Sequence, residues 1–477
     1  MIRRHFLGSL AGTAAFAADK PKPNIVVILA DDLGTGDVGA YNRNGIVKTP
    51  NLDRFSRQGM RFTDAHSPSS LCTPTRYGLL TGRYCWRSRL KSGVLNGESP
   101  NLIEPGRPTL PSVLHGAGYR TGGFGKWHLG LGLAAKTDYS KRLEPSPLDH
   151  GFDEYFGIPA SLDMPPYLYF DGRMAVEQPT RTIGDNGEAK RGAYWRGGPI
   201  APGFAMEDVV PKTGDRAMRF IRDTTKKQTP YFAYVPLPAP HTPWVPGKAF
   251  QNRSRAKLYG DFVEQLDHTI GGILGAVEET GQAGNTLVII TSDNGAPWEK
   301  RDMEENGGHW ANLDLRGQKS DAYEGGHRVP FLVRWPAKVR AGTVSDVPIC
   351  HTDLFATCCG AAGVAMPMDA AEDSFAIQAA LAGKRGDKAV RPHLVHHAGN
   401  GMFALREGGW KWIDGLGSGG FTLPVKIEAK PGRAAGQLFQ IERDPNERED
   451  LALQEPAQAA RLSAMLDKIR REGRTRA

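Results

Sequence analysis

Residues 24–32 read Asn-Ile-Val-Val-Ile-Leu-Ala-Asp-Asp, an apolar and largely β-branched run that ends in two acids. A run of this kind is typical of a strand buried on both faces of a parallel sheet. Residues 286–294 have the same pattern, because Thr-Leu-Val-Ile-Ile-Thr is followed there by Ser-Asp-Asn. The sequence therefore predicts two buried strands with polar side chains at their carboxyl ends, the edge where ligands bind in open α/β sheets.

The segments between and around these strands alternate between strand-like and helix-like patterns. Further strands are expected at residues 119–123, 231–235 and 331–334, and helices at residues 51–58, 75–80, 109–117, 213–224 and 260–280. This alternation predicts an α/β fold in which a large, mixed but mostly parallel sheet is sandwiched by helices. We expect this part of the fold to occupy residues 22–365.

The pattern changes near residue 366. Short alternating runs occur at residues 402–405, 410–413 and 437–441, and a helix is expected at 456–472. Alternation over a few residues is typical of strands with one buried face. Residues 366–477 are therefore expected to form a smaller C-terminal α+β domain with an antiparallel sheet.

The first 17 residues resemble an export signal. Arg3 and Arg4 precede a small and apolar run that ends in Ala15-Phe16-Ala17, an A-x-A cleavage pattern. The paired arginines favour the twin-arginine route. A membrane anchor is the alternative, but the run is too short to span a bilayer. We therefore expect cleavage near Ala17, a periplasmic or extracellular protein, and no stable membrane insertion.

Composition limits the classes of molecule that the protein is expected to bind. The chain carries 60 Lys and Arg against 52 Asp and Glu, so its formal net charge of +8 falls to +6 when Arg3 and Arg4 are removed. A positive surplus can steer anionic substrates, but no basic and aromatic array indicates nucleic-acid binding. Five cysteines are too few for a disulfide scaffold. If Cys72 is set aside as a candidate reacting group, the other four cysteines either form one disulfide bond among them or are all buried free thiols. These four are Cys85, Cys350, Cys358 and Cys359.

Four oxygen-bearing side chains follow the two buried strands: Asp31, Asp32, Asp293 and Asn294. A lone Asp-Asp pair more often caps a helix. Three carboxylates that converge at one sheet edge would, however, repel one another without a cation. Oxygen-only ligands suit Ca²⁺ or Mg²⁺ rather than zinc. The pattern therefore predicts a site for a divalent cation.

Cys72 lies in Ser69-Ser70-Leu71-Cys72-Thr73-Pro74-Thr75-Arg76, followed by Gly78-Leu79-Leu80-Thr81-Gly82-Arg83. An inert buried thiol is the alternative, yet the Ser, Thr and Pro neighbours make a poor core. A helix that starts near Pro74 would direct its first N–H groups toward a bound anion. This segment is therefore a candidate for the reacting group.

Four basic residues are weak candidates when each is taken alone. An extended backbone through Gly125-Lys126-Trp127-His128-Leu129-Gly130 would project Lys126 and His128 to the same side. His241 lies in a proline-rich loop beyond the strand expected at 231–235, where an imidazole would be held in place. Lys319, ahead of Tyr323-Glu324-Gly325-Gly326, would by itself be a solvated loop lysine.

Taken together and in this order, the motifs resemble those of type I sulfatases of the alkaline-phosphatase superfamily along nearly all of residues 24–450. The resemblance implies an alkaline-phosphatase-like fold and a Cys72 that a formylglycine-generating enzyme converts to formylglycine (3-oxoalanine). The hydrate of that aldehyde would attack the sulfur of a sulfate ester. The resemblance also implies Ca²⁺, in preference to Mg²⁺, with these ligands: Asp31, Asp32, Asp293, Asn294 and an oxygen of the modified Cys72.

The resemblance also implies roles for the basic residues. Arg76 would brace the modified residue, and Lys126 and Lys319 would clamp sulfate oxygens. His241 would assist the leaving oxygen, while His128 would later take a proton from the sulfated diol. These residues would then form the catalytic set of a sulfuric ester hydrolase together with Cys72.

Substrate recognition is expected outside these motifs. Ser161 matches a polar site residue of arylsulfatases, although Leu162 departs from their pattern. Residues 163–203 and 296–311, rich in aromatics and glycine, are expected to shape the pocket beyond the sulfate. Sulfated carbohydrate is the preferred substrate class and aryl sulfates the second. Two alternatives are a phosphodiesterase or phosphonate monoester hydrolase on the same scaffold, and a non-catalytic Ca²⁺-dependent binder of sulfated glycans if Cys72 is unmodified.

Overall fold

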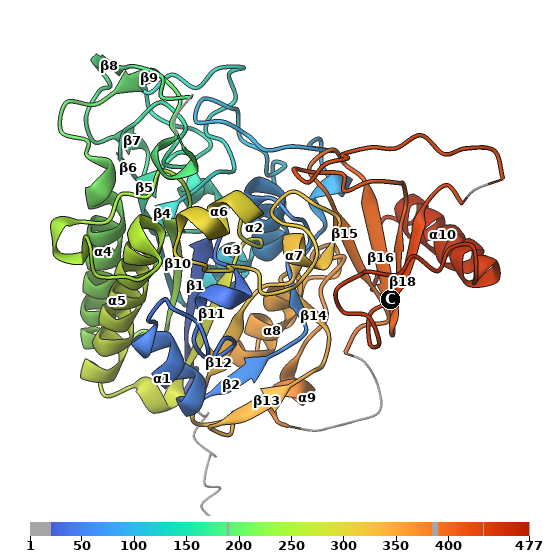
Figure 1. Ribbon diagram of the computed structural model, residues 1–477. Coiled ribbons are helices and arrows are strands. Elements are labelled where there is room, and N and C mark those ends of the chain that lie inside the picture. The colour runs from blue at the N-terminus through green and yellow to red at the C-terminus, as the bar shows by residue number, and fades with distance from the viewer. Residues whose placement is uncertain (1–20, 188–189, 384–389, 433, 477) are drawn as a thin grey trace, which may run out of the picture.

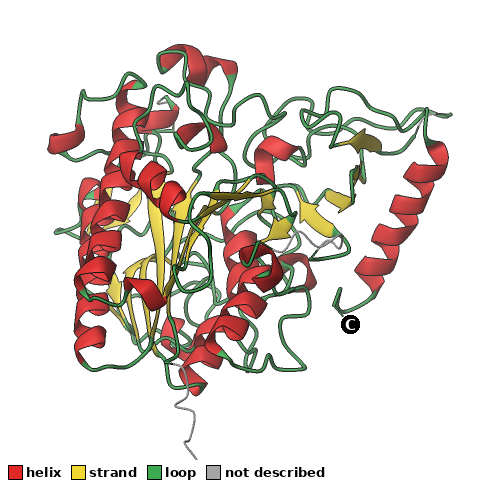
Figure 2. Ribbon diagram, turned by 90° about the horizontal axis from the view of Figure 1, so that it is seen from below, coloured by secondary structure: helices red, strands yellow, loops and turns green. Residues whose placement is uncertain are grey.

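The computed structural model describes residues 21–187, 190–383, 390–432 and 434–476. The export signal expected at residues 1–17 lies outside them. A ten-stranded sheet with helices on both faces makes up most of the molecule, and a four-stranded sheet with one long helix lies at one end (Figure 1). Figure 2 shows the larger sheet between its two helical layers. The expected fold class is confirmed.

The large sheet is mixed, with five parallel strands at its centre. Across the sheet the order is β13 (Thr343–Ser345), β2 (Met60–Phe62), β12 (Phe331–Arg334), β11 (Thr286–Ser292), β1 (Asn24–Asp31), β10 (Tyr231–Pro240), β4 (Arg120–Lys126), β5 (Glu154–Ile158), β6 (Phe170–Asp171) and β7 (Met174–Ala175). Strands β11, β1, β10, β4 and β5 pair in parallel. Every residue of β1, β10 and β11 is buried, as their continuous apolar sequences predict.

Helices cover both faces of this sheet. The helices of this part of the chain are α1 (Pro50–Gln58), α2 (Cys72–Thr81), α3 (Leu110–Gly116), α4 (Val209–Lys226), α5 (Lys257–Glu279), α6 (Lys300–Glu305), α7 (Glu324–His327), α8 (Asp353–Ala362) and α9 (Gln378–Leu381). Helices α4 and α5 lie on one face, and α2, α3 and α8 lie on the other (Figure 1). The five helices expected in this part of the sequence are all present, and the largest boundary error is at α4, which begins at Val209 rather than Thr213. Helix α2 begins at Cys72 rather than Thr75.

The C-terminal sheet is antiparallel, as expected. Its order is β15 (Leu394–His397), β16 (Phe403–Glu407), β17 (Trp410–Ile413) and β18 (Gln437–Gln440), and α10 (Pro456–Arg471) packs beside it. Two-stranded sheets pair β14 (Ile349–Cys350) with β3 (Ala65–His66), and β8 (Arg181–Ile183) with β9 (Gly198–Ile200). All five cysteines are buried free thiols. Among the described residues, no helix is both long and apolar enough to cross a bilayer.

Candidate active site

The register of the two central strands brings the four oxygen-bearing side chains together. Ala30 of β1 lies opposite Ser292 of β11, so the residues that follow meet at the carboxyl edge of the sheet. The Asp293 N–H donates to the Ala30 carbonyl at 3.0 Å, and the Asp32 N–H donates to Asp293 Oδ1 at 3.2 Å. The Asn294 side chain donates to Asp32 Oδ1 at 2.7 Å. Asp31 is the fourth of these oxygen-bearing side chains, and all four are buried.

Cys72 is the first residue of α2 and is buried at this edge. Its Sγ lies 3.6 Å from Asp31 Oδ1. The helix begins here because Leu71 is extended and its carbonyl accepts the Thr75 N–H at 3.2 Å. Burial raises the pKa of the Cys72 thiol, with Lys126 and Lys319 opposing the rise. The unmodified thiol is therefore a poor nucleophile near neutral pH.

Arg76 stands one helical turn after Cys72 and points toward the same edge. Its guanidinium donates to Asp293 Oδ2 at 2.7 Å and to the Lys126 carbonyl at 3.0 Å. Burial opposes the charge, but Asp293 and Asp31 raise the pKa of Arg76, so it stays cationic. Burial and the neighbouring Asp31 in turn raise the pKa of Asp293. This pair fixes the orientation of one carboxylate at the site.

Two lysines contact the other two carboxylates. Lys126 Nζ lies 2.6 Å from Asp31 Oδ2, and Lys319 Nζ lies 2.7 Å from Asp32 Oδ1. Burial alone would raise the pKa of Asp31, but Lys126, His241 and Arg76 together lower it well below its ordinary value. The site therefore pairs three carboxylates with three cationic side chains, and their formal charges cancel.

His128 reaches the site by a turn rather than along an extended strand. Strand β4 ends at Lys126, Trp127 is buried in the core, and His128 has a φ of 56°. The expectation of an extended backbone is therefore wrong, although both Lys126 and His128 lie at the site. His128 Nε2 is 2.7 Å from the Leu95 carbonyl, which can only accept, so Nε2 carries the proton. Nδ1 is buried with no partner among the described residues.

The pKa of His128 is lowered well below its ordinary value. Burial is the main cause, and the positive charges of Lys126 and Arg76 add to it. The imidazole is therefore neutral near pH 7, and its unpartnered Nδ1 lone pair is available to accept a proton. That is the state a general base requires.

His241 follows directly on β10, which continues through Pro236, Pro238 and Pro240. The first part of the proline-rich loop expected after residue 235 is therefore strand, because prolines at alternate positions leave the intervening N–H groups free to pair, while His241 itself lies in a loop as expected. His241 Nδ1 lies 2.7 Å from the Thr242 carbonyl and so donates to it. Nε2 lies 3.7 Å from Asp32 Oδ2.

A pocket of about 430 Å³ opens on these residues. Six residues singled out from the sequence line it: Asp32, Cys72, His128, Ser161, His241 and Lys319. Arg76, Lys126, Asp31, Asp293 and Asn294 contact the site but are not among the lining residues. Part of the wall comes from the segments expected to shape it, with Asp163, Arg191, Tyr194 and Arg196 from the first and Pro297 from the second.

Other parts of the wall were missed by sequence reasoning. Leu71, Val94, Thr242 and Phe421 also line the pocket. Phe421 comes from the loop between β17 and β18, and its side chain is 49% exposed. An aromatic residue in the glycine-rich sequence Gly-Ser-Gly-Gly-Phe was the only signal for it. The C-terminal sheet therefore contributes to a site otherwise built on the large sheet.

The residues at the sheet edge fit a hard divalent cation. Ligand atoms of Asp31, Asp32, Cys72 and His241 lie within 4.8 Å of one another. Asn294 Oδ1 is buried and lacks a hydrogen-bond partner among the described residues, so it is free to coordinate. Carboxylate and amide oxygens are the ligands that Ca²⁺ and Mg²⁺ prefer.

Comparison with known proteins gives one consistent result. The family model described as Sulfatase matches residues 23–364. N-acetylgalactosamine-6-O-sulfatase of Bacteroides thetaiotaomicron is 34% identical, covering 94% of this chain and 93% of that protein. Steryl-sulfatase of Mus musculus is 32% identical, and the match covers 96% of this chain and 83% of that protein. One similar solved structure comes from work on the metabolism of multiple glycosaminoglycans by B. thetaiotaomicron. Its TM-score is 0.84 and its sequence identity is 32%, and the match covers 95% of this chain and 100% of that chain.

Proposed function

Because the chain belongs to the sulfatase family and is an enzyme that hydrolyses sulfate esters, we propose that it acts on sulfated carbohydrate through a formylglycine made from Cys72. One observation carries this proposal. Cys72 opens α2 at the base of a pocket and lies beside Asp31, yet burial raises the pKa of its thiol. A formylglycine-generating enzyme would supply the conversion, and the hydrated aldehyde would supply a hydroxyl nucleophile that the thiol cannot.

We propose Ca²⁺ as the cation, held by Asp31, Asp32, Asp293, Asn294 and an oxygen of the modified Cys72. When bound, it would supply positive charge beside the sulfuryl oxygens and lower the pKa of the attacking hydroxyl. The protein charges already cancel, so a divalent cation would give a positive surplus that matches an anionic ester. The unpartnered Asn294 Oδ1 supports this ligand set.

Lys126 and Lys319 would clamp the sulfate oxygens, and Arg76 would brace the modified Cys72 and add a third positive charge. Lys319 lines the pocket, while Lys126 and Arg76 are fixed behind it by Asp31 and Asp293. Cations placed in advance stabilise developing charge without reorganisation at the moment of reaction. His241 donates from Nδ1 to the Thr242 carbonyl, which leaves Nε2 as the atom that would assist the leaving oxygen.

His128→Gln is expected to lower kcat about 100-fold or more, because the neutral Nδ1 would no longer accept the proton whose removal releases sulfate. The wild-type enzyme should lose this base only as pH falls through a pKa well below the ordinary value of 6.5. A pH profile of kcat checks this, and the acid limb should be absent from the variant. His115→Gln, an exposed histidine outside the pocket, is the control. An unchanged acid limb in His128→Gln would exclude the base role.

The pocket beyond the sulfate favours a sugar over a steroid. Asp163, Arg191 and Arg196 are charged lining residues, and Ser161 Oγ is buried without a partner among the described residues. Sugar hydroxyls can bond to the unpartnered Ser161 Oγ and Asp163 Oδ1, whereas a steryl ring system would leave both atoms unpaired. Arg196 is ion-paired with Asp163, which keeps both side chains in place. Ser161 and Asp163 are therefore proposed to contact the substrate.

A substrate panel tests the proposed function. N-acetylgalactosamine 6-sulfate is expected to show a kcat/KM at least tenfold above that of a steryl sulfate, and above that of an aryl phosphodiester. Faster turnover of the phosphodiester would favour the alternative hydrolase on the same scaffold. Binding of sulfated sugars without any turnover would favour the non-catalytic alternative. Mass spectrometry of the peptide with Cys72 should find sulfur replaced by oxygen.

Two expectations about organisation remain predictions. We propose that the catalytic domain spans residues 22–365, because all the proposed catalytic and metal-binding residues fall within it, and that residues 366–477 form a subdomain that adds Phe421 to the pocket wall. Export through cleavage near Ala17 is also still a prediction.

A further inference from the structure

A second pocket, of about 580 Å³, lies where three segments meet. It is formed by the loop after α2, by the turn that precedes β16, and by the last residues of α10 with the tail that follows. Its charged lining residues are Arg83, Arg87, Lys91, Arg470, Arg471 and Glu472. Five cations against one acid make it strongly positive, and we call it the basic pocket.

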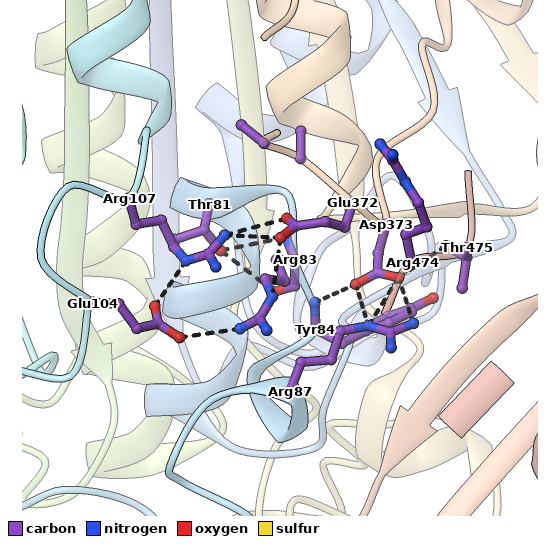
Figure 3. Close-up of polar contacts among 12 residues, drawn as sticks. Thr81, Arg83, Tyr84, Arg87, Glu104, Arg107, Glu372, Asp373, Arg474 and Thr475 are labelled. Atoms are coloured by element: carbon purple, nitrogen blue, oxygen red, sulfur yellow. Dashed lines mark hydrogen bonds and ion pairs between the residues drawn. The ribbon is translucent and has the colours of Figure 1, made fainter. Parts of the chain in front are cut away.

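Two of the five cations are neutralised by an ion-pair network. Figure 3 shows Arg83 contacting Glu104 and Glu372, and Arg87 contacting Asp373. The corresponding distances are 3.1 Å, 3.2 Å and 2.9 Å. Asp373 is fully buried, and the Thr475 hydroxyl also donates to it. Arg83 and Arg87 therefore form a rigid wall and add little net charge.

The other three cations keep most of their charge. Lys91 Nζ donates to the Trp86 carbonyl at 2.8 Å, a neutral acceptor. The carboxylates nearest to Arg470, those of Asp414 and Asp467, are 3.6 and 3.7 Å away and exposed, so solvent screens both pairs. Among the described residues, no carboxylate lies within 4.0 Å of the Arg471 guanidinium. Three weakly paired cations against the single acid Glu472 leave the open side of the pocket with a net positive charge.

Uncharged groups in the basic pocket suit a sugar. Ser92 and Asn400 line it with a hydroxyl and an amide. Trp86 and Phe403 pack edge to face with ring centroids 5.3 Å apart, and the buried Trp86 Nε1 has no partner among the described residues. Arg87 and Arg470 lie over these two rings, so the aromatic pair supports the pocket wall and holds the cations in place. The hydroxyl and amide can bond to sugar hydroxyls, and the cations add a preference for an anionic sugar.

The basic pocket is close to the active-site pocket along the chain. Ser92 lines the first and Val94 lines the second. Two residues span at most about 7 Å. The Gly93 N–H donates to the Gly399 carbonyl at 2.9 Å, which fixes this segment to the turn that carries Asn400. A ligand longer than one sugar could therefore contact both pockets.

Another neighbour of the active site lacks this charge preference. A groove that shares Phe421 with the active-site pocket is lined by Trp298 and Trp310. Its charged lining residues are Glu299, Lys300, Asp314, Arg316, Glu447 and Arg448, which balance. Of these two neighbours of the active-site pocket, the basic pocket is the one whose charge favours an anionic chain.

We propose that the basic pocket is a second subsite for the saccharide chain and binds a sulfate or carboxylate of a sugar near the one whose ester is cleaved. The proposal rests on the proposed function, since it takes the occupant to be the same substrate. It makes the enzyme selective for oligosaccharides with several anionic groups over a single sulfated sugar.

The test is the double variant Lys91→Glu/Arg471→Glu. Its matched control is Lys226→Glu/Lys227→Glu, which changes the net charge equally at the end of α4, outside both pockets. The substrates are N-acetylgalactosamine 6-sulfate and a hexasaccharide of alternating uronic acid and 6-sulfated N-acetylgalactosamine, with the sulfated sugar at its non-reducing end. The ratio of hexasaccharide to monosaccharide kcat/KM should fall about tenfold in the pocket variant, or about 1.4 kcal/mol, and stay within twofold in the control.

A titration separates this inference from the proposed function. With Cys72→Ala in both proteins, the hexasaccharide Kd should rise about tenfold when Lys91 and Arg471 are reversed. Equal Kd values, or an equal change in the control pair, would overturn the second subsite. If neither sugar is hydrolysed by the wild-type enzyme, the proposed substrate is wrong, and the titration still reports on the basic pocket.

Discussion

Cys72→Ser is expected to abolish repeated turnover of an aryl sulfate, with a loss on the order of 10⁴-fold or more in kcat. A serine hydroxyl in place of the formylglycine hydrate can accept one sulfuryl group, but it has no second hydroxyl through which to release it. The variant should therefore react at most once. Steady-state kinetics and the intact mass of the protein after incubation with substrate measure both parts of this prediction.

Cys85→Ser is the matched control for this experiment. Cys85 is also buried, but it lies outside the active-site pocket. Its substitution should leave kcat within about twofold, because no proposed step uses it. Repeated turnover by Cys72→Ser would contradict the proposed nucleophile, and so would an active wild-type enzyme whose Cys72 is still an unmodified thiol.

The two apolar runs of the sequence predicted the centre of the large sheet and the side chains that meet at its carboxyl edge. Residues 24–30 and 286–291 are typical of buried strands of a covered sheet because they are short, continuous and rich in β-branched residues. Once Ala30 and Ser292 lie opposite each other in parallel, the acids after each strand must meet at one edge. The convergence of Asp31 and Asp293 therefore follows from strand pattern alone.

Local backbone turns were harder to predict. The turn at His128, with a φ of 56°, depends on contacts that its short motif does not encode, such as the bond from the ring to the Leu95 carbonyl. The start of α2 at Cys72 depends on the extended Leu71. Proline at alternate positions in β10 contradicts the usual rule for strands. Tertiary contacts decided each of these cases.

The pocket wall is the least predictable part. Phe421 and Val94 belong to loops that strand and helix periodicity cannot place in space. The same is true of the basic pocket, whose segments are distant in sequence. Loops carry specificity because a rigid scaffold positions them, so a motif can indicate the reaction while the substrate depends on long-range packing.

Removal of divalent cations is expected to lower kcat/KM for an aryl sulfate at least 100-fold, and Ca²⁺ should restore it better than Mg²⁺. The reason is the donor set, since Mg²⁺ requires near-ideal octahedral geometry and keeps waters, whereas buried carboxylates and an amide suit Ca²⁺. Activity after chelation and Ca²⁺ titration measures the effect, and Tm should rise with Ca²⁺ because binding stabilises the folded state.

Asn294→Ala should raise the Ca²⁺ concentration for half-maximal activity about tenfold. The control Asn44→Ala, at an exposed asparagine outside the active-site pocket, should not. Full activity in excess chelator, with no change in Tm on adding Ca²⁺, would rule out the proposed cation.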